Sequence, residues 1–362
     1  MNDIYILCKI ELYISILEKI NIMTQRTLTQ FGYKSGQTKK TMCDFVLDYN
    51  TMESIFTDLE PPASLNPSLK LHTTIKSRDE GFTWRIWSTG QRDMIYAPTT
   101  TENDVKWDAP VLKSNLQKAI RRQDREAALS STLQLALIDK QELLRRLPII
   151  TIEDVCLIKG TATIVWLMMA AKNDISLSEI NFILRYVDAL CFEKNVFFNN
   201  KSIKVDKTSH IQIAKNVELA ALNIRASYGG MKGDMQMLMR AVKYYEKKVI
   251  AEALELPDPM ARIPELELPK IVSHDFILLS EGIDFHPYPW ILSYIFNKTK
   301  IPKDQIKSII WNAESGPNNR KSWTIEKQTI AKNEDIWLII SEYLEKARNI
   351  IITKHYTIAC DV

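Results

Sequence analysis

The stretch KAIRRQDREAALSSTLQLALIDKQELLRRLPIITIEDV, residues 118–155, carries the clearest helical pattern in the chain. Its apolar residues recur three or four positions apart, as in helices that bury one face, and they include Ile120, Ala127, Ala128, Leu129, Leu133, Leu135, Ala136 and Leu137. The charged run at 121–126 predicts a turn between two helices. We expect a third helix around Leu143, Leu144 and Leu147, which ends where Pro148 marks the start of a new segment. Glu153 and Asp154 are acids of the kind that favour the beginning of a further helix.

The composition is typical of an ordinary globular protein. The chain has 362 residues, of which 46% are hydrophobic and 25% charged, and its net charge is +3. Its five cysteines are scattered without a CxxC pair, which favours a reduced intracellular compartment, nuclear or cytoplasmic. Charged residues interrupt the apolar segment 1–22, so we expect neither a signal peptide nor a membrane partner.

A small β element is expected before the helices. The segments LKLHTTIKS (69–77) and GFTWRIWSTGQRDMIYAP (81–98) are rich in Thr, Ile, Trp and Tyr, and the second is broken at 88–91 as in a hairpin turn. Alternation along the second segment places Trp84 on one face and Arg85 and Trp87 on the other. These residues favour a small sheet packed on helices over a platform that stacks single-stranded bases.

The segment 23–40 contains four cations and no acid, which is typical of a mobile basic tail. Within it, Gln25, Leu28 and Phe31 resemble the motif that binds the sliding clamp PCNA, although Gly32 separates Phe31 from Tyr33. One helical turn with this spacing presents two apolar groups to a groove, while Gln25 bonds at its rim. The resemblance implies a clamp-binding set of Gln25, Leu28, Phe31 and Tyr33.

A second resemblance lies in the helical region. The runs LQKAIR (116–121), DREAAL (124–129), LRRL (144–147) and EDV (153–155) are similar to the carboxy-terminal helices of clamp-loader-related AAA+ ATPases. The closest pattern is that of the replication-associated recombination group, which includes the Werner-helicase-interacting ATPase. In that family these helices form an oligomeric collar, so the resemblance implies interhelical or interface salt bridges for Arg121, Arg122, Arg145 and Arg146. Glu153 and Asp154 are the expected acceptors.

The nucleotide-binding part of that family has no counterpart here. No Gly-x4-Gly-Lys-Ser/Thr loop occurs in the sequence, so neither ATPase activity nor a cofactor is expected.

Two other segments carry candidate nucleic-acid contacts. Gly229, Gly230 and Gly233 separate two helical patterns, with Asp234 as an expected N-cap and with Arg225 and Lys232 placed beside a phosphate-sized corner. A tight helix–turn–helix corner is the simpler interpretation. The loop at 310–323 sets Arg320 and Lys321 between two tryptophans, which suits backbone contact and base stacking as well as a plain exposed loop.

A metal site is the main alternative to a binding protein. His274, Asp275, Asp284 and His286 carry ligand types for a divalent ion, which would make the protein a metal-dependent hydrolase or nuclease. The neighbouring Pro287 and Pro289 more simply mark a helix start, so we expect no metal.

Together these patterns predict a mainly α protein, a multi-helix domain with a small β hairpin element near the amino-terminal third. The expected parts are a flexible extension (1–42), a small α+β segment (43–110), a collar-like helical domain (111–254), a Pro-rich linker (255–270) and a helical carboxy-terminal segment (271–362). The expected function is a non-catalytic accessory factor in DNA replication or repair, recruited by a sliding clamp. Its helical body would bind DNA or another replication protein, and self-assembly is left open, as is a purely structural interaction role.

Overall fold

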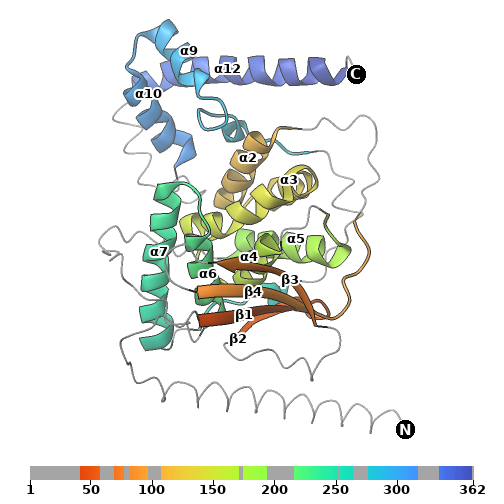
Figure 1. Ribbon diagram of the computed structural model, residues 1–362. Helices are drawn as coiled ribbons and strands as arrows, with labels where there is room; N and C mark the ends of the chain where they lie inside the picture. Colours follow the sequence, from red (N-terminus) through yellow and green to blue (C-terminus); the bar gives the residue numbers. More distant parts are fainter. Residues whose placement is uncertain are drawn as a thin grey trace. The chain divides into compact units, whose positions relative to one another are not determined.

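The computed structural model describes residues 41–57, 69–76, 82–96, 107–170, 174–193, 216–251, 253, 255–263, 276–316 and 334–360 (Figure 1). Contacts divide the chain into residues 1–40 and 41–362. The predicted mainly α fold with a small β element is confirmed. None of the described helices has the length and apolar character that a membrane crossing requires.

The helices follow one another along most of the described chain. The amino-terminal group is α2 (Ala109–Arg122), α3 (Arg125–Asp154), α4 (Thr161–Met169), α5 (Leu177–Phe192), α6 (Val217–Ser227) and α7 (Lys232–Glu246). The carboxy-terminal group is α9 (Trp290–Thr299), α10 (Lys303–Ile310) and α12 (Glu334–Cys360), with short turns η4 (Ser280–Gly282) and η5 (Trp311–Ser315). In this group α12 packs against both α9 and α10 (Figure 1).

The β element is a mixed sheet of β1 (Thr41–Asp48), β2 (Glu53–Thr57), β3 (Lys70–Lys76) and β4 (Phe82–Thr89), in the order β2-β1-β4-β3. Strands β1 and β4 are parallel, with Phe45 opposite Ile86. The hairpin turn predicted at 88–91 is wrong, because β4 pairs with β1 and β3, and residues 90–96 form no strand beyond an isolated bridge from Ile95 to Ser176. The chain instead turns to α5, where the Asp93 carboxylate accepts from the Ser178 amide at 2.8 Å.

The two faces of the sheet have the predicted alternation. Trp84 and Ile86 are buried, and the Trp166 indole of α4 donates to the Phe45 and Trp87 carbonyls at 3.1 and 2.9 Å. On the opposite face, Arg85 makes two hydrogen bonds of 2.6 Å to the buried Asp44 carboxylate. Because the Arg85 guanidinium is bound to the Asp44 carboxylate, this face of the sheet does not offer the guanidinium to the bases of a single strand.

The turn between α2 and α3 forms where the charged run predicts it. Gln123 adopts the left-handed conformation, with φ of 59°, and the Asp124 carboxylate caps α3 by accepting from the Ala127 amide at 3.1 Å. Such a left-handed residue followed by an acidic N-cap ends one helix and starts the next.

The interior of α3 agrees with the prediction in having a break before Leu143, Leu144 and Leu147, but it has no new helix start at Pro148. The break lies at Asp139, with φ of −154° and ψ of 75°, and Pro148 lies inside the helix. The Asp139 carboxylate caps the following segment by accepting from the Glu142 amide at 3.0 Å. The expected helix start at Glu153 and Asp154 is also wrong, since α3 ends at Asp154.

The carboxy-terminal group begins as predicted, with Pro289 at the N-cap of α9. Part of the expected linker is docked: Pro259 is buried, and Arg185 of α5 donates to the Met260 and Ile263 carbonyls at 3.1 Å each. Helix α12 buries Ile340, Leu344, Ala347 and Ile351 in the core. The predicted domain boundaries stay predictions.

Candidate functional site

The arginines of the opening stretch take part in ion pairs between helices. Arg121 of α2 makes a bidentate contact with Asp154 of α3, with Nε–Oδ1 at 2.6 Å and Nη2–Oδ2 at 3.2 Å. Both side chains are buried, so this ion pair is shielded from water and its geometry is fixed by the two hydrogen bonds. The predicted interhelical role of Arg121 is therefore confirmed.

The other three arginines find different partners from those expected. Arg122 lies 3.4 Å from Glu281, and Arg145 lies 3.7 Å from Glu142 on its own helix. Arg146 reaches Asp234 of α7 at 3.3 Å and also donates to Gln117. The expected direct pairing of Arg145 and Arg146 with Glu153 and Asp154 is wrong, because Arg145 pairs with Glu142 of α3 itself and Arg146 pairs with Asp234 of α7.

Asp284 lies at the centre of a buried polar cluster. Its Oδ2 accepts from Lys118 Nζ and from Ser315 Oγ, each at 2.6 Å, and lies 2.9 Å from His286 Nδ1. Burial alone would raise the pKa of Asp284, but the His286 hydrogen bond and the Lys118 charge outweigh it and hold the pKa well below its ordinary value. Asp284 is therefore an ionised anchor that joins α2 to η5.

This cluster does not have the geometry of a catalytic or metal site. Asp284 contacts both Ser315 and His286, whereas a nucleophilic triad needs the histidine between the other two. Within the described part of the chain, no three His, Cys, Asp or Glu side chains come together to hold a metal ion. The other two members of the predicted metal set, His274 and Asp275, lie outside the described residues.

The glycine corner separates α6 from α7 as predicted, with Gly229 and Gly230 at φ of 106° and 145°. Asp234 lies in the first turn of α7, whereas Met231 is the N-cap residue. Arg225 is 1% exposed, and its guanidinium donates to the Arg145 carbonyl at 2.9 and 3.0 Å and to the Gly229 carbonyl at 2.9 Å.

The buried position of Arg225 shows in its electrostatics. Burial and the nearby Arg145 charge lower the pKa of Arg225 to about 10. Its donors bind backbone inside the protein, so of the two predicted contacts at this corner only Lys232 is exposed. Arg320 and Lys321, and the clamp-binding set Gln25, Leu28, Phe31 and Tyr33, lie outside the described residues.

A second buried network has Glu179 of α5 at its centre. Its carboxylate accepts from Arg92 Nε at 2.8 Å, from Lys140 Nζ at 2.9 Å and from the Tyr49 hydroxyl at 3.0 Å. Burial would raise the pKa of Glu179, yet the Arg92 and Lys140 contacts hold it at about 2. This network was not predicted from the sequence, although the capping-box spacing from Ser176 to Glu179 is a local signal for it.

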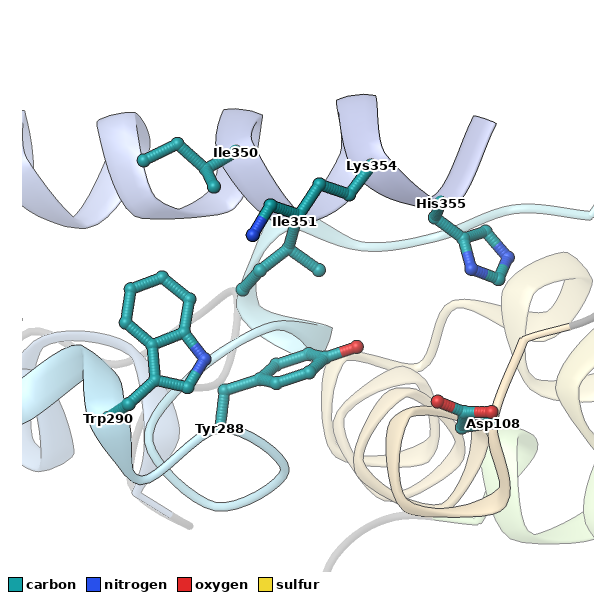
Figure 2. Close-up of a pocket in the computed structure, with 7 residues that line it drawn as sticks. All are labelled: Asp108, Tyr288, Trp290, Ile350, Ile351, Lys354 and His355. Carbon is teal, nitrogen blue, oxygen red and sulfur yellow. The ribbon is translucent and has the colours of Figure 1, made fainter. Parts of the chain in front are cut away.

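A pocket of about 420 Å³ opens beside α12 (Figure 2). Its walls come from α12, from the segment that leads into α9 and from the residue that precedes α2. The lining residues include Asp108, Tyr288, Trp290, Ile351, Lys354 and His355. The pocket combines aromatic rings with one acidic and one basic exposed side chain, and no motif in the sequence indicated it.

Comparison with models of protein families, with curated proteins and with solved structures found no match. The resemblance to the collar helices of clamp-loader-related ATPases therefore rests on the sequence runs alone and stays a prediction.

Proposed function

We propose that this protein is a non-catalytic accessory factor in DNA replication or repair, recruited by a sliding clamp through its amino-terminal tail. The observation that carries the proposal is the spacing of Gln25, Leu28 and Phe31 in a basic segment. A short motif in a polar tail reaches a preformed groove on a partner without disturbing the folded body.

A non-catalytic role is supported by what the charged clusters do. The ionisable side chains around Asp154, Asp284 and Glu179 are used in ion pairs that hold helices together. In each cluster the acid is buried and bound by a cation, an arrangement that fixes the packing of the elements that carry them.

Contact between the helical body and DNA is supported by the charge pattern of α7. At 3.6 residues per turn, Lys232, Arg240 and Lys243 of α7 fall within an arc of about 80° around the helix axis. None of the three is buried, and Lys232 is exposed. A row of cations along one helix face suits the phosphate backbone of DNA, which binds by charge and independently of sequence.

The clamp contact is tested with the full chain and the sliding clamp of the source organism by calorimetry. We expect a dissociation constant of about a micromolar or weaker, since the tail must order on binding. Replacing Leu28 and Phe31 by Ala abolishes this binding, while the matched double change of Thr29 and Gln30 to Ala leaves it intact. Absence of heat at millimolar concentrations would remove the main support for the proposal.

The DNA contact is tested separately by titration with duplex DNA at several salt concentrations. Lys232→Ala should weaken binding and reduce the salt slope by about one phosphate contact. Lys346→Ala, a change of an exposed lysine on α12, is the matched control. If the protein binds the clamp but not DNA, we would conclude that the helical body binds another replication protein.

A further inference from the structure

We propose that the pocket beside α12 binds a guanine base together with its phosphate, either as a free nucleotide or as an unpaired residue of single-stranded DNA. The second source deepens the proposed function and rests on its nucleic-acid contact, whereas the first does not depend on it. The inference draws on three features of the pocket: an aromatic wall, an acidic acceptor and an exposed cation (Figure 2).

The aromatic wall is formed by Tyr288 and Trp290. Both side chains enter the pocket, and Trp290 is 41% exposed, so its indole is accessible for stacking (Figure 2). Ile351 of α12 lies across from them and is almost completely buried. An accessible aromatic ring stacks on a flat base, and such stacking contributes substantially to affinity.

Asp108 supplies the preference for guanine. It is the N-cap residue of α2, yet its carboxylate makes no capping bond to that helix, and it points into the pocket (Figure 2). An ionised carboxylate only accepts hydrogen bonds. Guanine places an N1–H and a 2-amino group side by side, matching two carboxylate oxygens, whereas thymine offers one N–H between two carbonyl oxygens.

Lys354 supplies the cation for the phosphate. It lines the pocket from α12 and is exposed. The neighbouring His355 ring stacks on Trp107, with ring centroids 3.8 Å apart, and burial lowers the pKa of His355 despite the nearby Asp108. Lys354 is therefore the exposed cationic side chain that the pocket offers to a phosphate.

These charges favour a nucleotide over an apolar protein segment. A base with its phosphate can hydrogen-bond to Asp108 and form an ion pair with Lys354, whereas a purely apolar side chain would use neither charge.

The test measures binding to the full chain of 2′-deoxyguanosine 5′-monophosphate, its thymidine counterpart and unphosphorylated deoxyguanosine. We expect the guanine nucleotide to bind about tenfold more tightly than the thymine nucleotide, and Trp290→Ala to weaken it about tenfold. Asp108→Asn should remove the preference for guanine. Lys354→Ala should lower the affinity for the nucleotide to that for the nucleoside.

Matched controls separate the pocket from general effects. Trp311→Ala changes another partly exposed tryptophan, and Lys346→Ala another exposed lysine of α12; both should leave nucleotide binding unchanged. Circular dichroism and thermal unfolding check that each variant folds.

A second arm uses short oligothymidylates with and without one central guanine. Binding of the free nucleotide alone supports the pocket and assigns it to free nucleotides. Oligonucleotide binding that Trp290→Ala leaves unchanged overturns the pocket while the proposed function stands. Absence of both nucleotide and oligonucleotide binding at millimolar concentrations also overturns the inference, and capture of an apolar helical peptide by the same residues would make the pocket a protein-docking site.

Discussion

Glu218 provides a direct test of the electrostatics inside the helical body. Its carboxylate is buried and caps α4, accepting from the Gly160 amide at 2.8 Å and from the Ala162 amide at 2.5 Å. Burial raises the pKa of Glu218 from 4.5 to about 7, although the two amide hydrogen bonds oppose the increase. The folded protein therefore holds a proton at Glu218 more tightly than the unfolded chain does.

The sign of the pH effect follows from this difference. Between the unfolded pKa of 4.5 and the folded pKa of about 7, the folded state binds more protons, so stability falls as pH rises. Integrated from about pH 5 to about pH 8, the loss is about 2.5 kcal/mol. Glu218→Gln removes the titrating group and keeps an oxygen that accepts one amide hydrogen bond. From about pH 5 to about pH 8, the unfolding free energy of the variant should therefore rise by about 2.5 kcal/mol relative to that of the wild type.

Urea unfolding at several pH values measures this difference. Glu179→Gln is the contrasting control, because the folded pKa of Glu179 is depressed to about 2. The stability that the ionised Glu179 carboxylate contributes is present above its unfolded pKa and is lost only in acid. The Glu179→Gln variant should therefore be destabilised by a constant amount over the same pH range. A Glu218→Gln difference that does not change with pH would refute the assignment of a raised pKa to Glu218.

Two further predictions concern packing and ion pairs. Leu144→Ala should cost about 2–5 kcal/mol of unfolding free energy, because its side chain is fully buried in α3, and a near-neutral effect in urea unfolding would contradict that packing. Arg121→Ala should cost about 3–5 kcal/mol by leaving Asp154 buried without its cation, whereas Arg146→Ala should cost about 1 kcal/mol or less, since Arg146 and Asp234 are partly exposed. Equal effects of the two arginine variants in the same assay would show that burial does not decide their roles.

Local signals in the sequence were sufficient where neighbouring residues decide the structure. The α2–α3 turn was predicted from the charged run at 121–126, and the structure shows that Asp124 of this run caps the helix that follows. At Pro148 the local signal misled. A proline removes one backbone hydrogen bond, but the buried Leu144 and Leu147 hold the helix together through it, and the break lies at Asp139.

Contacts between distant residues left no pattern to detect. The parallel pairing of β1 with β4 joins residues such as Phe45 and Ile86. The Lys118–Asp284 bond spans 166 positions. The pocket depends on three separate segments for Asp108, Trp290 and Lys354. Periodicity and short motifs describe single elements, so they predicted the helices and not the sites that form between them.

The buried ion pairs connect the fold to the proposed nucleotide pocket. A desolvated pair contributes little net stability, but a displaced partner leaves a buried charge uncompensated, so such pairs strongly favour one arrangement of the elements that carry them. Lys118–Asp284 ties α2 to the segment that leads into Tyr288, and Arg348 ties α12 to the same segment through the Ile283 carbonyl at 3.0 Å. These are the three elements that line the pocket. The same contacts that hold the carboxy-terminal helices in place therefore set the distance between the acidic and the basic side of the pocket, which is what selection of a particular nucleotide requires.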